Sequence, residues 1–157
     1  MSKLIFAPIL IFAYNREDKI KNLISSLIKC QGFHNSDIFV FCDGPKNNQD
    51  KIKVDKTRKI IRDKFNDNVT IFEQKKNLGL AKSIYEGVNN VFESYDRLIV
   101  LEDDLEINKG FLNYMNLALT KYQNDDKVYQ ISGHFFEPPG LNINKAVFMP
   151  FISTWGW

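Results

Sequence analysis

Cysteine is scarce in this sequence. Cys30 and Cys42 are the only two cysteines among 157 residues, which is too few for a disulfide framework or a cysteine-based zinc site. Each of them ends an apolar or amphipathic run, so we predict that both are small buried hydrophobic side chains. Two isolated thiols are typical of a reducing compartment. We therefore expect a cytoplasmic protein, with peripheral attachment to a membrane left open.

A large excess of charge of one sign is also missing. The 21 Lys and Arg residues exceed the 19 Asp and Glu residues by only two. A domain that binds nucleic acid is usually strongly basic, so we expect no nucleic-acid partner. With 44% hydrophobic and 25% charged residues, the composition excludes collagen, low-complexity and disordered acidic chains. The length suits one domain with a core of its own.

No apolar run is long enough to cross a membrane, which takes about 20 apolar residues. The run at residues 4–13 follows Lys3 and imitates a secretory leader. However, it contains Pro8, and no small-residue cleavage site follows Ala13. We therefore predict a buried first strand here and no transmembrane segment.

Apolar patterns of two kinds alternate along the chain. Short continuous runs predict strands at residues 8–13, 37–42, 69–73, 97–101 and 128–131. Three-and-four spacing predicts helices around residues 20–28, 49–65, 80–95 and 111–122. Strands and helices in alternation indicate an α/β fold, in which helices cover both faces of a mostly parallel sheet.

Some details of the helices can be specified. Asn15 precedes the first helix and is predicted to cap its N-terminus. In the weakly patterned helix at 49–65, Ile52, Ile60 and Ile61 are predicted to form the inner face. In the helix at 80–95, the apolar stripe begins at Leu80.

Two segments depart from the neutral total. Residues 51–64 carry seven basic and two acidic side chains, whereas residues 93–106 carry six acidic and one basic. A basic run on a helix is usually a solvated face, and we interpret the first segment in this way. The second segment is different, because half of its carboxylates directly follow the apolar run at 97–101.

These three carboxylates are Glu102, Asp103 and Asp104. Alternation along an extended chain would place Glu102 and Asp104 on one face and turn Asp103 away. Neighbouring carboxylates repel each other unless a cation or strong donor compensates them. Because an all-oxygen set suits Mg²⁺ or Mn²⁺, we favour a metal site. The alternative is a solvated acidic turn before the next helix.

Polar residues follow every predicted strand. Arg16 follows the first, Asp43 the second, Asn77 the third, and the carboxylates around Asp104 the fourth. In open α/β sheets ligands bind beyond the carboxyl ends of the strands, so we expect one binding site there. Neither of the common glycine-rich phosphate loops is present. A divalent cation held by carboxylates could neutralise a diphosphate instead.

Four short motifs carry a resemblance to a known family. In chain order they are Ala13-Tyr14-Asn15-Arg16, Cys42-Asp43-Gly44, Asn77-Leu78-Gly79-Leu80-Ala81 and Leu101-Glu102-Asp103-Asp104-Leu105-Glu106. Together they resemble the nucleotide-sugar half of the GT-A glycosyltransferases. The N-acetylglucosaminyltransferase I-like group is the most similar, followed by family 2 glycosyltransferases. The last motif is similar to that group's version of the DxD motif, and Gly156-Trp157 resembles its Gly-Trp. Nearly the whole chain is covered.

The resemblance implies roles for the residues that bind the nucleotide. Arg16 would lie beside the uridine and the phosphates, and Asp43 would accept a hydrogen bond from the uracil. Asn77 and Lys82 would flank the nucleotide.

It also implies roles for the acidic motif. Asp103 would approach the ribose or the donor sugar, and Asp104 would coordinate the Mn²⁺ or Mg²⁺ ion that bridges the diphosphate. Glu102 would support the site. The GT-A (Rossmann-like) fold is implied as well.

The implied reaction is metal-dependent transfer of a sugar from a UDP-sugar to a glycan or another hydroxyl acceptor, with inversion. The family's catalytic base lies beyond the Gly-Trp segment, and Asp125, Asp126 and Glu137 are poorly placed to replace it. We therefore expect residues 1–157 to be a single donor-binding portion of a GT-A domain, truncated at its C-terminus.

Two other functions are weighed against this one. A magnesium-binding receiver-like regulatory module would carry an acidic pair after the first strand, where this chain has Asn15 and Arg16. A sugar nucleotidyltransferase would need a loop rich in Gly and Arg at the same place. His34 and His134 are more typical of structural histidines than of bases.

Overall fold

The structure is a computed structural model that describes residues 6–65, 69–134 and 147–157. In these residues four parallel strands form one sheet in the order β3-β2-β1-β4. The strands are β1 (Ile9–Ala13), β2 (Ile38–Cys42), β3 (Thr70–Glu73) and β4 (Ile99–Glu102). The helices are α1 (Glu17–Leu27), the short 3-10 helix η1 (Phe33–Asn35), α2 (Asn48–Phe65), α3 (Leu80–Phe92) and α4 (Phe111–Tyr122).

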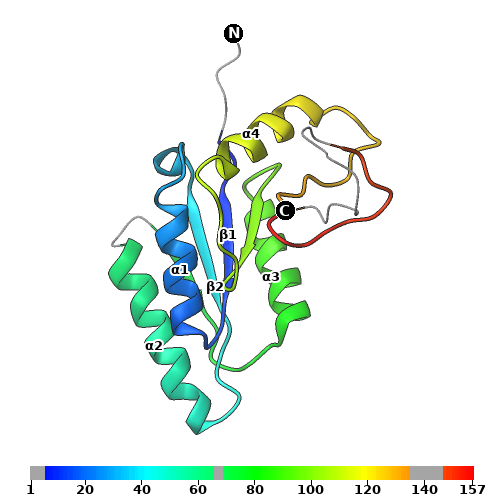
Figure 1. Cartoon of the computed structure of the whole chain (residues 1–157). Coiled ribbons are helices and arrows are strands. Elements are labelled where there is room, and N and C mark those ends of the chain that lie inside the picture. Colours follow the sequence, from blue (N-terminus) through cyan, green and yellow to red (C-terminus); the bar gives the residue numbers. More distant parts are fainter. Residues whose placement is uncertain (1–5, 66–68, 135–146) are drawn as a thin grey trace, which may run out of the picture.

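The sheet is covered on both faces (Figure 1). In β1, Ile9, Ile11 and Ala13 pack into the cluster that contains residues of α1, α2 and α4. Leu10 and Phe12 point the other way and pack into the cluster with α3. All five side chains are buried because successive residues of a strand face opposite sides. The expected α/β fold, with helices on both faces of a parallel sheet, is confirmed.

Helix α1 forms where the sequence predicts a helix. Its buried stripe is Ile20, Leu23, Ile24 and Leu27. The expected cap is wrong, because Arg16 occupies the N-cap position and no side chain caps the helix.

Asn15 has another partner. It turns toward α2, where its Nδ2 donates a hydrogen bond to Asp50 Oδ1 at 2.6 Å.

The inner face of α2 differs from the predicted one. Its buried residues are Val54, Thr57, Ile61 and Phe65, at helical spacing. Ile52 is 63% exposed, so its assignment to the inner face is wrong. The four buried residues between positions 54 and 65 form the side of the helix that packs onto the rest of the domain. Ile52 lies outside that side.

Helix α3 also packs through smaller residues than expected. Ser83, Gly87 and Val91 are its buried residues, whereas Leu80 is 59% exposed. The ring of Phe12 lies against residue 87 and leaves no room for a larger side chain there. The apolar stripe therefore predicts the helix correctly, but it does not predict which residues of α3 pack most closely against the sheet.

The predicted strand at 128–131 is wrong. This segment has no regular structure, and Tyr129 is 92% exposed. The place beside β4 is taken by Trp157, whose backbone exchanges two hydrogen bonds with Val100. Residues 128–131 instead lie near the C-terminal segment, where Gln130 Nε2 donates to the Ser153 carbonyl at 2.6 Å.

Two further predictions can be compared with the structure. Most cations of the basic segment are paired on the surface of α2, as in Lys51–Asp55 and Lys59–Asp63, which fits a solvated helix face. Cys30 and Cys42 are free thiols and both are buried, as predicted.

Among the described residues, no helix combines the length and the apolar character needed to span a membrane.

Candidate functional site

The carboxyl ends of the strands meet at one edge of the sheet. β1 runs away from the N-terminus marked in Figure 1, and this edge lies at its far end. Asp43 N donates to the Ala13 carbonyl at 2.9 Å, and Tyr14 N donates to Asp103 Oδ2 at 3.3 Å. These two bonds join the ends of β1, β2 and β4.

Arg16 contacts both aspartates of the acidic motif. Its Nη1 donates to Asp104 Oδ2 at 3.0 Å, and its Nη2 donates to Asp103 Oδ1. The Asp103 side chain is 2% exposed, whereas those of Asp104 and Arg16 are 43% and 47% exposed. The guanidinium therefore bridges one buried and one accessible carboxylate.

The backbone turns immediately after β4. The strand ends at Glu102, and Leu105 N donates to the Glu102 carbonyl at 3.2 Å. Strand alternation therefore does not continue through the motif. The expectation that Asp103 points away from Asp104 is wrong, since both reach the same guanidinium.

The acidic motif is short of positive charge. Burial raises the pKa of Asp103, and the attraction of Arg16 offsets only part of this rise. Burial also raises the pKa of Glu102, and the charges of Asp104 and Asp103 raise it further. Burial alone would lower the pKa of Arg16, but the attraction of the two aspartates raises it. Three carboxylates thus share one guanidinium, which favours an additional cation.

Glu102→Gln should stabilise the ligand-free protein at neutral pH. A carboxyl whose pKa is raised in the folded state binds its proton more tightly there than in the unfolded chain, so ionisation costs stability. The gain should be about 1 kcal/mol or less, because solvent screens this partly exposed group. Thermal unfolding from pH 4 to pH 7 tests this. The two proteins should differ at pH 7, and the difference should disappear as the pH falls below the unfolded pKa of about 4.3.

Asp43 is the centre of a buried hydrogen-bond network. Its Oδ1 accepts from Gly44 N and Leu78 N, each at 2.7 Å. Its Oδ2 accepts from Asn77 Nδ2 at 2.8 Å and Gly79 N at 3.0 Å. A carboxylate offers about four acceptor positions, so all are used within the protein. Asp43 is 6% exposed, so this carboxylate is buried although it directly follows the end of a strand.

The loop after β2 and the loop after β3 are in close contact. A Cβ on Gly44 would lie 2.4 Å from the backbone carbon of Lys76, so only glycine fits. Gly79 has φ +81° and ψ 161°, a conformation that is essentially restricted to glycine. Asn77 Nδ2 also donates to the Gly44 carbonyl at 3.1 Å. The Asn77-Leu78-Gly79 motif thus wraps around Asp43.

Sequence reasoning missed Arg58. From α2, its Nη2 donates to the carbonyls of Gln74 at 2.7 Å and Asp43 at 3.1 Å. It joins the ends of β2 and β3, although the sequence places it in the solvated basic segment. The available signal is its spacing, because it lies four residues after Val54 and three before Ile61, on the buried side of the helix.

Asp50 was missed as well. It accepts hydrogen bonds from Tyr14 Oη and from Lys46 N, in addition to the one from Asn15. Burial raises the pKa of Tyr14 to about 12, and the hydrogen bond to Asp50 adds to this effect. Asp50 therefore ties the loop after β1 to the first turn of α2.

The remaining predicted residues lie apart from this network. Lys82, on the first turn of α3, is 61% exposed and pairs with Glu86 at 3.6 Å. His134 follows no strand, and its ring lies 5.0 Å from that of Trp155. Glu137 lies outside the described residues.

The donor set at the strand ends fits a hard divalent cation. In the described parts of the chain, no three His, Cys, Asp or Glu side chains are arranged as a metal-binding group. Mg²⁺ commonly binds one or two carboxylates and completes its shell with water and substrate phosphates, so three protein ligands are not required. Of the two aspartates, the half-exposed Asp104 offers accessible hard oxygens that could take part in such a shared site, whereas Asp103 is buried.

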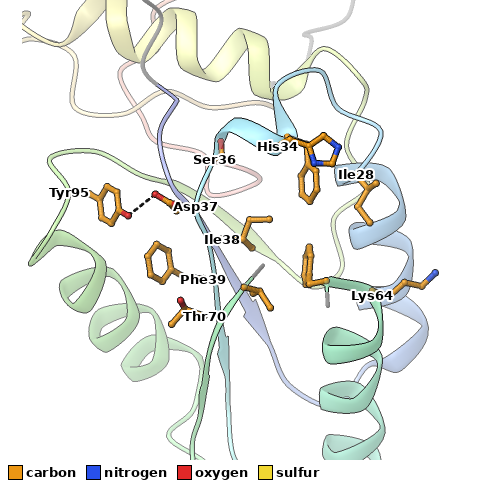
Figure 2. A pocket seen from close by; sticks show the side chains of 12 residues that line it. Ile28, His34, Ser36, Asp37, Ile38, Phe39, Lys64, Thr70 and Tyr95 are labelled. Carbon is orange, nitrogen blue, oxygen red and sulfur yellow. Dashed lines mark hydrogen bonds between the residues drawn. The ribbon is translucent and has the colours of Figure 1, made fainter. Parts of the chain in front are cut away.

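A cavity lies at the opposite edge of the sheet. It has a volume of about 680 Å³ and is lined by residues at the amino ends of β2 and β3, including Ile38, Phe39 and Thr70. Figure 2 shows Tyr95 at its margin, where the hydroxyl donates to Asp37 at 2.8 Å. None of the predicted site residues lines this cavity.

Known proteins resemble this chain in sequence pattern and in fold. The model of glycosyl transferase family 2 matches residues 9–153. The structure of GalNAc-T7 with UDP, GalNAc and Mn²⁺ aligns with a TM-score of 0.56 and 15% identity, over 76% of this chain and 22% of that one. The mannosyltransferase PcManGT from Pyrobaculum calidifontis, in complex with GDP-Man and Mn²⁺, gives a TM-score of 0.49 and 13% identity, over 78% and 34%. No curated protein matches.

The family model settles the family, and the alignment with GalNAc-T7 supports the fold. The chain spans only 22% and 34% of the two solved proteins, and at 15% identity the first alignment shows the fold alone. The family model, in contrast, covers all four strands and the polar residues at their ends. The chain belongs to glycosyl transferase family 2 and has the GT-A type of α/β fold.

Proposed function

We propose that this chain is the donor-binding part of a metal-dependent glycosyltransferase. It binds a UDP-sugar, and the enzyme transfers the sugar to a hydroxyl of a glycan or another acceptor, with inversion. The observation that carries the proposal is the Asp103–Asp104 pair beside Arg16 at the carboxyl end of β4. In a family 2 domain, such an acidic pair suits a cation and a diphosphate bound together.

Asp104 and Asp103 have different tasks in this proposal. Asp104 is half-exposed and is the accessible metal ligand. Asp103 is fixed by Tyr14 N and Arg16. Because it lies beside Asp104, it would approach the ribose or the donor sugar of the bound donor. A bound Mn²⁺ or Mg²⁺ ion would supply the positive charge that stabilises the departing diphosphate. Glu102 adds a third negative charge next to Asp103 and Asp104, which would support the binding of a cation.

The nucleotide would lie across the ends of β1, β2 and β3. Arg16 would donate to the phosphates, and the loop at Asn77 would border the base. Asp43 can accept a bond from uracil only if it gives up a present donor. In the described part of the chain, Asn77 is the only residue whose side chain donates to it, so we propose that the base displaces this amide. Lys82 would contribute positive charge from the surface of α3.

Chemistry at the acceptor requires a base outside this set of residues. Asp125 accepts from the backbone of Lys127 in a turn after α4, and Glu102 is the last residue of β4, next to the acidic pair. We therefore propose that residues 1–157 form the donor portion of the GT-A domain and that a further segment supplies the base. The similarity to the N-acetylglucosaminyltransferase I-like group rests on the Glu-Asp-Asp-Leu-Glu motif and is part of the same proposal.

Thermal unfolding with different ligands tests the function. Samples would contain Mn²⁺ with UDP, GDP or CDP, and Mg²⁺ with acetyl phosphate as the test for a receiver-like module. A ligand at a hundred times its Kd stabilises by about 2.7 kcal/mol, which is about 5–10 °C for a chain of this size. We expect such a shift with UDP and Mn²⁺, and its loss with EDTA. A shift with acetyl phosphate alone, or none with any nucleotide, would contradict the proposal.

A further inference from the structure

Arg16 already occupies the position of a cation between Asp103 and Asp104. We propose that Arg16 is an internal counter-ion at the proposed metal site, and that it makes metal binding depend on the presence of the diphosphate. This inference rests on the proposed function and adds a coupling between its two ligands.

The geometry divides the contact into a fixed half and a movable half. Asp103 is buried and also accepts from Tyr14 N, so it stays in place. Asp104 and Arg16 are each about half exposed, and their contact at 3.0 Å lies at the surface. The Arg16–Asp104 contact is therefore the one that a ligand can replace.

A divalent ion that arrives alone meets an unfavourable environment. To bind Asp104 it must approach a carboxylate whose Oδ2 lies 3.0 Å from the guanidinium. The ion either displaces Arg16 from Asp104 or binds beside it against the repulsion between like charges. We therefore expect the metal alone to bind weakly.

A diphosphate removes this obstacle. Its oxygens accept charge-assisted hydrogen bonds from arginine, often in pairs, so Arg16 can exchange Asp104 for phosphate. Asp104 is then free for the metal, and the phosphate oxygens complete the coordination shell. Each ligand favours the other, and thermodynamic linkage requires the two effects to be equal.

Three other cations near the strand ends have contacts of their own. Arg58 donates to backbone carbonyls of both strand ends, and Arg62 pairs with Glu73. Lys46 Nζ lies 5.5 Å from the centre of the Tyr14 ring. Arg16 is the described cation that contacts both aspartates, and the coupling is assigned to it.

Titration of Mn²⁺ with and without UDP tests the inference, with free Mn²⁺ followed by its electron paramagnetic resonance signal. Wild type should bind Mn²⁺ more tightly with UDP, and UDP more tightly with Mn²⁺, by the same factor. Arg16→Gln should bind Mn²⁺ alone at least about fivefold more tightly than wild type, which is the lower end of usual coupling factors. Its gain in Mn²⁺ affinity when UDP is added should be smaller than that of wild type, because coordination by the phosphate oxygens remains while the exchange at Arg16 is lost.

Two further variants complete the experiment. Arg62→Gln makes the same change of charge on a half-exposed arginine that pairs with Glu73, and it should behave as wild type. Arg16→Lys keeps the charge but loses the fork that reaches two carboxylates. It should show a coupling factor between those of wild type and Arg16→Gln, and it keeps the test valid if Arg16→Gln does not fold.

The possible contrary results distinguish a failure of this inference from a failure of the proposed function. Unchanged or weaker Mn²⁺ binding by folded Arg16→Gln, or a coupling factor in Arg16→Lys equal to that of wild type, would overturn the inference. An equal gain in Mn²⁺ affinity on adding UDP in Arg16→Gln and in wild type would overturn it while leaving the proposed function intact. No UDP binding by wild type under any condition would overturn both.

Discussion

Asp104→Asn is expected to abolish Mn²⁺-dependent binding of UDP. The substitution keeps the size of the side chain but removes the charge that makes Asp104 a ligand for a hard cation. Loss of a residue that merely supports a metal ligand costs about 10–100-fold, so loss of a ligand should cost at least this much. Isothermal titration of UDP in Mn²⁺ measures the effect, which should leave only the weak binding seen in EDTA.

The variant should keep its fold, because the Asp104 side chain is 43% exposed. Surface substitutions of this kind usually change the free energy of unfolding by no more than about 0.5 kcal/mol. Asp63→Asn is the matched control, since Asp63 is also exposed and paired with a cation, Lys59. Unchanged UDP affinity in Asp104→Asn would show that Asp104 is not the metal ligand.

Asp43→Ala is expected to destabilise the protein strongly. The change removes the acceptor of four hydrogen bonds and leaves the buried N–H group of Gly44 and the partly buried N–H groups of Leu78 and Gly79 without it. A buried group left unsatisfied costs about 1–3 kcal/mol. We expect a total of about 3–5 kcal/mol in the free energy of unfolding, because water entering the gap recovers part of the loss. Denaturation with urea, followed by circular dichroism, measures it.

Asp43→Asn separates the two roles of this side chain. Asparagine fills the same space and keeps one acceptor oxygen, so this variant should be destabilised less than Asp43→Ala. Some destabilisation should remain, because the new amide NH₂ group faces groups that also donate. UDP affinity should fall in both variants because the Asn77 loop loses its anchor and the base loses its proposed acceptor. A variant that is as stable as wild type but fails to bind UDP would show that Asp43 contacts the base without organising the loops.

Most of the fold could be predicted because three of its four strands, β1, β2 and β4, are largely buried on both faces. A continuous apolar run such as residues 9–13 is what a covered parallel strand requires, and the predicted and observed strands agree for β1 to β4 within two residues. The segment at 128–131 has the same apolar character but is not a strand. Trp157 occupies the edge of β4 where a further strand would pair. The local apolar pattern at 128–131 carries no information about this competition from a distant residue.

The candidate site could be predicted only in outline. Parallel strands bring their carboxyl ends together, so Arg16, Asp43 and the acidic motif were expected at one edge, and the structure brings them together there. What each side chain contacts depends on backbone geometry. The turn at Asp103 and the loop around Asp43 are set by tertiary hydrogen bonds, which sequence spacing does not encode. The functional roles of these residues remain predictions.

The most direct test of the account is to locate bound Mn²⁺–UDP by paramagnetic broadening of backbone amide signals in nuclear magnetic resonance spectra. The account predicts broadening at the carboxyl ends of the strands, at residues 14–16, 43–44, 77–79 and 102–104. Signals from the cavity at the opposite edge, at residues 37–39 and 70, should stay sharp, and Asp104→Asn should restore the broadened signals. Broadening centred on residues 37–39, or none at residues 102–104 under saturating UDP, would contradict it.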